Sequence, residues 1–255
     1  MDGIIIVNKP PGWTSFDVVA KIRGLTRVKK VGHSGTLDPM ATGVLPVFLG
    51  RATKSIQYFL NGDKGYEGDM TLGVRTDTGD AEGKPQTSNI QLQNNWQITM
   101  TKEQIEEAFK KYVGEIEQVP PMYSAVRIKG KRLYELARQG IEVKREPRKI
   151  TIYDLQVISF NPHPLAPSPT GRGGSEARLA TVSFSVLCSK GTYVRQLAVD
   201  IGNDLGCGAH LSRLVRTYAH PFRLSQAHDM ETIVNLVKIG QLDSVVIPVD
   251  AILTP

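Results

Sequence analysis

The amino-acid sequence predicts an α/β fold, of the α+β kind, because stretches with the period of a strand alternate along the chain with stretches that have the period of a helix. The clearest strand is at residues 66–72, where Tyr66, Met70 and Leu72 share one face and polar residues occupy the other. The clearest helix begins at Thr14, the first residue of a Thr-x-x-Asp capping pattern. With 255 residues, 40% of them hydrophobic, the chain can bury one large core or two smaller ones.

The N-terminal part of the chain is expected to form one strand and one helix. Residues 4–7 are a short apolar run, which predicts a buried strand. After Thr14, the residues Val18, Ile22 and Leu25 recur at helical spacing, so one face of this helix should pack inward.

Further elements follow in the middle of the chain. Thr101 and Gln104 form a second capping pattern, and the helix they begin should end before Gly114. Residues 150–160 and 179–188 are predicted to be strands, the second with apolar residues in alternation.

Two segments are predicted to be irregular. Residues 84–97 are polar, and residues 161–178 contain four prolines and three glycines. Such a composition cannot bury enough apolar surface to offset the ordering of its backbone, so residues 161–178 are expected to be a disordered insertion between two strands.

The helix after the second of these strands carries an arginine beside its apolar face. Val194, Leu197 and Ile201 recur at helical spacing, and Gly206 closes the helix. Arg195 lies near the first turn, where a guanidinium needs either a carboxylate partner or solvent. The alternative interpretation is an ordinary surface arginine.

Residues 31–46, V-G-H-S-G-T-L-D-P-M-A-T-G-V-L-P, combine three glycines with one imidazole and one carboxylate. Glycine permits backbone conformations that a Cβ forbids, and Pro39 pushes Asp38 toward extended geometry. A glycine-flanked loop that restrains His33 and Asp38 is one way to present a reactive group. On composition alone, a plain Asp-Pro turn is the more frequent explanation.

Positive charge is concentrated at residues 127–149. This basic segment contains nine basic and three acidic residues, so its net charge equals the +6 of the whole chain. A concentrated basic strip is the footprint of a protein that binds phosphate backbones. The alternative is a solvated face without a partner.

Several classes of protein are disfavoured by patterns that the sequence lacks. Cys188 and Cys207 have no C-x-x-C spacing, which fits a reducing cytosol and predicts a cytoplasmic protein. No apolar stretch is long enough to span a bilayer, and the N-terminus does not read as a signal peptide, so no membrane association is expected. The histidines are not spaced with carboxylates or thiols as metal ligands, and no dinucleotide-binding or Ser-His-Asp pattern occurs. We therefore expect no metal and no cofactor.

The glycine-rich loop and four other motifs, in their order along the chain, resemble the bacterial tRNA pseudouridine synthases of the B type. The loop matches as G-H-S-G-T-L-D-P-x-A-T-G-V-L-P. The other matches are V-x-K-P-x-G, D-K-x-Y, V-P-P-M-Y-S-A-V-R, and C-S-K-G-T-Y-V-R followed by L-G-C-G-A-H-L. The resemblance runs from about residue 4 to about residue 248.

This resemblance implies a pseudouridine synthase fold, with a mixed, mostly antiparallel sheet, flanking helices, a central catalytic cleft and the basic segment as a mobile arm. The catalytic domain is expected at residues 1–229, with a short C-terminal segment at residues 230–255 that begins with a helix. Many relatives continue into an RNA-binding module of the PUA type, which this chain is expected to lack. The insertion at residues 161–178 departs from the family pattern.

The resemblance also implies an activity, the isomerisation of uridine to pseudouridine at position 55 in the T-loop of tRNA, after the base is flipped out of its stack. Asp38 would be the nucleophile, attacking either uracil C6 or ribose C1′. Tyr66 would remove the proton from C5, and Arg195 would keep Asp38 ionised and aimed. His33 and Tyr193 would contact the nucleotide.

The expected partner is the T-arm of tRNA, bound by a monomer that needs no protein partner. Four basic side chains complete the set expected to bind the substrate: Lys9, Lys129, Lys131 and Arg132. For Lys9 a structural role, in bracing the catalytic loop, is the safer interpretation. Two other classes remain open, a non-catalytic RNA-binding protein on the same scaffold and a metal-dependent hydrolase. Phosphate binding alone requires none of Asp38, Tyr66 and Arg195, which disfavours the first.

Overall fold

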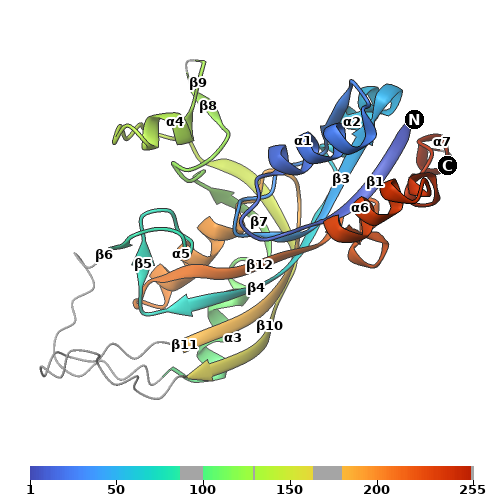
Figure 1. The fold of residues 1–255 in the computed structure, drawn as a ribbon. Helices are drawn as coiled ribbons and strands as arrows, with labels where there is room; N and C mark the ends of the chain where they lie inside the picture. The colour runs from blue at the N-terminus through green and yellow to red at the C-terminus, as the bar shows by residue number, and fades with distance from the viewer. Residues whose placement is uncertain (87–99, 129, 163–179, 254–255) are drawn as a thin grey trace, which may run out of the picture. The chain divides into compact units, whose positions relative to one another are not determined.

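The computed structural model describes residues 1–86, 100–128, 130–162 and 180–253 (Figure 1). Most of the irregular segment predicted at residues 84–97, and most of the insertion predicted at residues 161–178, lie outside these ranges.

The chain forms two compact units. The first unit consists of Met1–Glu67 and Leu214–Pro255, and the second unit is Gly68–Arg213. Strands β4 (Lys64–Leu72) and β12 (Ala209–Ala219) contribute residues to both units. Within the described part of the chain, no helix is long and apolar enough to cross a membrane.

The strands that lie wholly in the first unit are β1 (Gly3–Lys9), β2 (Val31–His33), β3 (Thr42–Leu49), β13 (Phe222–Arg223) and β14 (His228–Asp229). β3 lies inside a mixed sheet. It pairs antiparallel with β1 and with β2, and it pairs parallel with β12 at Thr42 and Gly43. β1 also pairs parallel with β14, and β13 pairs antiparallel with β12.

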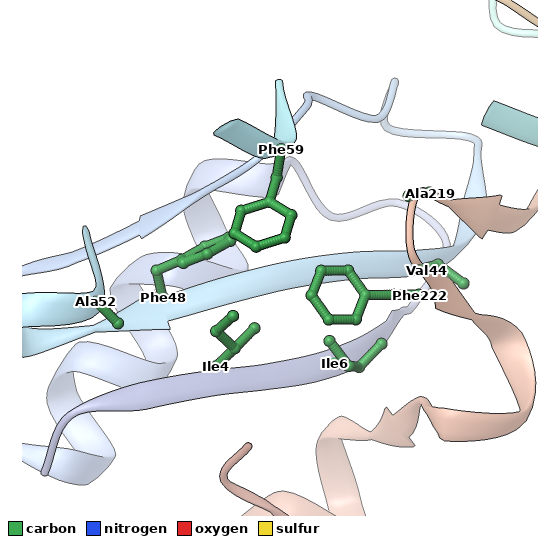
Figure 2. Packing of buried hydrophobic residues seen from close by; sticks show 8 residues of the cluster. All are labelled: Ile4, Ile6, Val44, Phe48, Ala52, Phe59, Ala219 and Phe222. Carbon is green, nitrogen blue, oxygen red and sulfur yellow. The ribbon is translucent and has the colours of Figure 1, made fainter. Parts of the chain in front are cut away.

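The apolar run at the start of the chain becomes the core of this unit. Alternate residues of a strand point to opposite faces, so Ile4 and Ile6 point together into one cluster (Figure 2). Three aromatic rings pack there, with centroid distances of 5.4 Å between Phe48 and Phe59 and 5.5 Å between Phe59 and Phe222. Burial of a side chain of this size contributes about 1.5–3 kcal/mol. The predicted strand at residues 4–7 is confirmed.

The first helix, α1 (Ser15–Thr26), begins where the capping pattern predicts. The Thr14 hydroxyl accepts a hydrogen bond from the Asp17 backbone N–H (3.1 Å), and the Asp17 carboxylate accepts one from the Thr14 backbone N–H (2.8 Å). α1 packs against β2 and against α6 (Met230–Lys238), which confirms a helix near residues 230–239. The other helical segments of this unit are short: η1 (Gly50–Ser55), α2 (Ile56–Phe59), η2 (Leu224–Gln226), η3 (Leu242–Val245) and α7 (Asp250–Leu253).

In the second unit, β10 (Arg148–Pro162) pairs antiparallel with both β7 (Gly114–Gln118) and β11 (Ala180–Cys188). Helix α3 (Lys102–Lys110) packs against β10, and the ring of Phe109 meets that of Phe184 on β11 edge-on, at 6.1 Å. The remaining described elements are β5 (Arg75–Thr76), β6 (Pro85–Gln86), β8 (Arg127–Ile128), β9 (Lys131–Arg132), α4 (Leu133–Ala137) and α5 (Val194–Asp204).

The predicted fold class is therefore confirmed: the chain is α/β, with a mixed and mostly antiparallel sheet and helices packed against it. The prediction of a loop through residues 31–46 was wrong at both ends, because β2 and β3 take in the first three and the last five of these residues. Strands β7 and β12 were not predicted.

Candidate active site

Asp38 lies in a short loop between β2 and β3. We call residues 34–41 the Asp38 loop. The carbonyl of Asp38 accepts a hydrogen bond from the N–H of Ala41 (3.1 Å), so Pro39 occupies the second position of a tight turn, where its fixed φ is favourable. At the other end, the Ser34 N–H donates to the carbonyl of Pro46 (3.2 Å). The Asp38 side chain is partly exposed, as a carboxylate that reacts with a ligand must be.

Lys9 braces the end of this loop. Its side chain is completely buried, and its ammonium donates to the carbonyls of Pro10 (2.8 Å), Trp13 (2.6 Å) and Pro39 (3.0 Å). The Gly12 N–H donates to the same Pro39 carbonyl at 2.9 Å. A buried ammonium that donates to these carbonyls holds the loop, which supports the structural role of Lys9. Contact of Lys9 with the substrate stays a prediction.

A serine that the sequence analysis did not identify holds the middle of the loop. The Ser15 hydroxyl accepts a hydrogen bond from the Leu37 N–H (2.9 Å) and donates one to the Leu37 carbonyl (3.3 Å). Ser15 is the first residue of α1, so the helix start and the residue before Asp38 are fixed to each other. Nothing in the sequence pattern distinguishes this serine from an ordinary residue of a helix first turn.

A second residue that was not identified, Arg216 on β12, lies under the start of the loop. Its Nε donates to the carbonyl of Val44 (2.8 Å), its Nη2 to Gly35 (3.0 Å) and its Nη1 to Thr36 (3.3 Å). The sequence could have indicated the burial of Arg216 only through the alternation of β12, because Arg216 is two residues from Leu214 and so lies on the same buried face of the strand.

Gly43 explains why β3 can approach β12 so closely. Its φ is +99°, and a Cβ at this position would overlap the backbone of Arg216. Only glycine satisfies both conditions, so this residue sets the spacing that brings Arg216 beneath the loop.

His33 ends β2, directly before the Asp38 loop. Burial lowers the pKa of its imidazole, and the positive charge of Arg216 lowers it further, while the backbone of Gly35 opposes the shift. The lowered pKa favours the neutral ring, a state in which it can stack on a base or share a hydrogen bond without charge. Its contact with a nucleotide stays a prediction.

Tyr66 lies on the buried face of β4, 8% exposed, in the alternation that the sequence predicts. This burial fits a packing tyrosine as well as one that faces a site. The predicted placement beside Asp38 stays a prediction.

Arg195 belongs to the second unit, in the first turn of α5, and is buried rather than on the surface. Its guanidinium lies 3.3 Å from the carboxylate of Asp80, with the two side chains 6% and 5% exposed. It also donates to the carbonyls of Thr78 (3.0 Å) and Tyr123 (2.8 Å). The surface interpretation of Arg195 was therefore wrong.

Asp80 is the functional candidate that the sequence analysis missed. Its carboxylate accepts hydrogen bonds from the Thr78 hydroxyl (2.6 Å) and the Glu82 N–H (3.1 Å), so the turn around it is ordered. Two features of the sequence could have pointed to Asp80. It is an acidic residue in a glycine-containing turn, and the chain has an arginine, Arg195, beside an apolar helix face that needs a carboxylate partner. The predicted pairing of Arg195 with Asp38 joins the two units and stays a prediction.

Tyr193 is the N-cap residue of α5 and is fixed by a buried glutamine. Gln118 accepts a hydrogen bond from the Tyr193 N–H (2.8 Å) and donates one to its carbonyl (3.2 Å). The side chain of Tyr193 remains partly exposed. Tyr193 and Arg195 thus start from one anchored helix end.

The basic segment, residues 127–149, contains the hairpin of β8 and β9 followed by α4. In its second half, three cations have acidic partners: Lys144 with Glu146 (3.6 Å), Arg145 with Glu142 (3.1 Å) and Lys149 with Glu115 (3.0 Å). In its first half, the four described cations are exposed and form no ion pair with a described residue: Arg127, Lys131, Arg132 and Arg138. Lys129 lies outside the described residues.

Comparison with protein families gives two matches that adjoin each other. The N-terminal domain of the TruB family pseudouridylate synthases matches residues 23–194, and the tRNA pseudouridylate synthase B C-terminal domain matches residues 195–254. Proteins named tRNA pseudouridine synthase B from Geobacillus thermodenitrificans and Pseudomonas aeruginosa are both 44% identical to this chain over 98% of its length, and the matches cover 78% and 76% of their own lengths.

Solved structures with a similar fold include a chain of a Cbf5-Nop10-Gar1 complex, with a TM-score of 0.66 and 31% identity over 95% of this chain and 56% of that chain. A chain of an H/ACA RNP bound to a substrate RNA containing 2'-deoxyuridine has a TM-score of 0.65 and 28% identity, over 96% of this chain and 59% of that one. The chain thus spans just over half the length of these solved chains.

Proposed function

Because the chain belongs to the TruB family of pseudouridylate synthases, we propose that it isomerises uridine to pseudouridine at position 55 in the T-loop of tRNA. The observation that carries this proposal is the Asp38 loop, in which a partly exposed carboxylate stands on a backbone held by buried side chains. A fixed carboxylate of this kind is preorganised for nucleophilic attack.

The reaction needs no net oxidation and no group from outside. The target uridine is flipped out of the T-loop stack. The Asp38 carboxylate forms a bond to uracil C6 or to ribose C1′, and the glycosidic bond between N1 and C1′ breaks. The uracil then rotates and joins C1′ through C5, and the bond to Asp38 breaks. The proton on C5 leaves and N1 takes up a proton, so the product is an isomer of the starting uridine.

Four other residues support this sequence of steps in the proposal. Tyr66 accepts the C5 proton, directly or through water. Arg195, held by Asp80, supplies the positive charge that keeps Asp38 ionised and aimed. His33 and Tyr193 contact the flipped nucleotide, the first as a neutral ring.

The decisive experiment uses an unmodified tRNA transcript and the purified chain, with pseudouridine mapped at single-nucleotide resolution. We expect one new pseudouridine, at position 55, and none in a transcript that carries cytidine at that position. Absence of pseudouridine from the first transcript, with folded protein, contradicts the proposed activity. Pseudouridine elsewhere contradicts the proposed site.

We place the RNA footprint on the first half of the basic segment, because its described cations are exposed and form no ion pair with a described residue. The proposal includes a monomer that acts in the cytoplasm without an obligatory protein partner. The cytoplasmic location is proposed because tRNA is the substrate and because the two cysteines show no disulfide pattern.

Charge reversal tests this footprint. The double variant Lys131→Glu/Arg132→Glu is expected to weaken tRNA binding and to flatten its salt dependence, because each lost phosphate contact lowers the slope of log K against log salt by roughly 0.7–0.9. The control is Lys144→Glu/Lys149→Glu, which changes the charge equally where acidic neighbours lie within 3.6 Å and 3.0 Å. Filter-binding titrations at several salt concentrations give both slopes. Equal slopes for the two variants contradict the placement of the footprint.

A further inference from the structure

Arg216 is a buried cation that forms no ion pair with any residue that the structure describes. Its side chain is among the largest fully buried ones, 1% exposed, and no acidic group of the described residues lies within ion-pair distance. Its three hydrogen bonds all go to backbone carbonyls. Burying a guanidinium costs free energy that an apolar side chain does not. What the structure offers in return for an arginine on this face of β12 is the set of carbonyls that it binds.

The carbonyls that Arg216 binds belong to the start of the Asp38 loop and to β3. The other anchors act further along the loop: Ser15 binds Leu37, and Lys9 binds Pro39. Among the described residues, Gly35 and Thr36 have Arg216 as the donor to their carbonyls. These two residues lie just before Leu37 and Asp38, so they decide the direction from which the chain enters the turn.

The conformation at Gly35 makes this anchor necessary. Gly35 has a φ of +98°. Glycine adopts such a backbone without a steric penalty, but it also has the most alternative conformations to lose. A glycine at the entrance of a loop leaves the loop free to move unless its peptide groups are bound.

We propose that Arg216 is a positioning residue for the isomerisation: through the carbonyls of Gly35 and Thr36 it fixes the entrance of the Asp38 loop and so the place of the Asp38 carboxylate. The guanidinium is suited to this because its planar fork reaches carbonyls of the loop and of β3 at once. This inference rests on the proposed function, in which Asp38 is the nucleophile.

The consequence is a separation of rate from binding. A misplacement of a reacting group by about 1 Å costs roughly 100-fold in rate. The tRNA contacts proposed on the basic segment do not involve Arg216. Arg216→Met should therefore lower the single-turnover rate of pseudouridine formation about 100-fold and change the Kd for tRNA by less than about threefold, or 0.7 kcal/mol. Arg216→Lys keeps a cation but not the fork, so its rate should fall between that of Arg216→Met and wild type.

The experiment compares both variants with wild type and with Arg213→Met. Arg213 lies on the same strand, but its side chain is 51% exposed and pairs with Asp69 at the surface. Circular dichroism melts give the folded fraction at the assay temperature. A role limited to stability would lower rate and binding together, in proportion to that fraction.

Three results overturn the proposal: rates for both Arg216 variants equal to that of Arg213→Met, parallel losses of rate and binding, or unfolding of both Arg216 variants at the assay temperature. If wild type itself forms no pseudouridine in this assay, the proposed function has failed, which is a separate result.

Discussion

Asp38→Asn is expected to abolish pseudouridine formation and to leave tRNA binding nearly unchanged. Asparagine has almost the same shape as aspartate but is a far poorer nucleophile, so the chemical step should disappear. The Kd should stay within about tenfold of wild type, or 1.4 kcal/mol, because a carboxylate makes no favourable contact with phosphate. Single-turnover assays and filter binding on the same preparation measure the two quantities.

The matched control for Asp38 is Asp243→Asn, which removes an exposed carboxylate from η3 in the same unit. It should behave as wild type in both measurements. Substantial turnover by Asp38→Asn, once mass spectrometry excludes deamidation back to aspartate, would eliminate Asp38 as the nucleophile. A folded variant that no longer binds tRNA would instead assign the loop a structural role.

Arg195→Met is expected to have the second large effect, on stability as well as on activity. It leaves the Asp80 carboxylate buried without its cation, and breaking a buried ion pair from one side costs about 3–5 kcal/mol. Activity should also fall, because Arg195 provides the positive charge proposed to act on Asp38. Urea unfolding gives the change in free energy, and the single-turnover assay gives the rate.

The double variant Arg195→Met/Asp80→Asn separates these two effects. The asparagine that replaces Asp80 is neutral and retains an oxygen that can accept from Thr78 and Glu82, so stability should recover in part while the rate stays low. A double-mutant cycle compares the unfolding free energies of wild type, Arg195→Met, Asp80→Asn and the double variant. The coupling energy between the two residues should exceed about 1 kcal/mol, which is within the range found for residues in direct contact. Additive losses would show that the pair does not act as a unit, and a recovered rate would exclude Arg195 from the reaction.

The parts of the fold that the sequence predicted well are those determined by neighbours in the chain. The capping patterns at Thr14 and Thr101 are satisfied by residues three positions away, and both helices begin there. The alternation at residues 66–72 likewise identified β4. Strands β2 and β3 were missed because glycines and prolines within them indicated a loop, whereas pairing with distant strands decides the outcome.

In the candidate site, too, residues in a local motif could be predicted from the sequence, whereas those that act on distant parts of the chain could not. Asp38 and His33 could be proposed as site residues because they stand in one contiguous motif. For Arg195 the sequence left a buried, paired arginine and a surface arginine both open, and the structure shows it buried. The anchors of the loop were harder to find. Ser15 and Arg216 bind backbone atoms. Every residue has a backbone carbonyl, so the sequence does not indicate which side chain will bind a given one.

The bonds from Arg216 to the Asp38 loop join residues 180 and 181 positions apart, whereas those from Lys9 and Ser15 to the loop span 30 and 22. During synthesis from the N-terminus, the shorter connections can close long before β12 has been made. Closing the longest loop also has the largest entropic cost, although this cost grows only with the logarithm of length. Asp38, the proposed nucleophile, is thus translated long before Arg216, and the anchor that we propose for its loop can form only after β12 has been made.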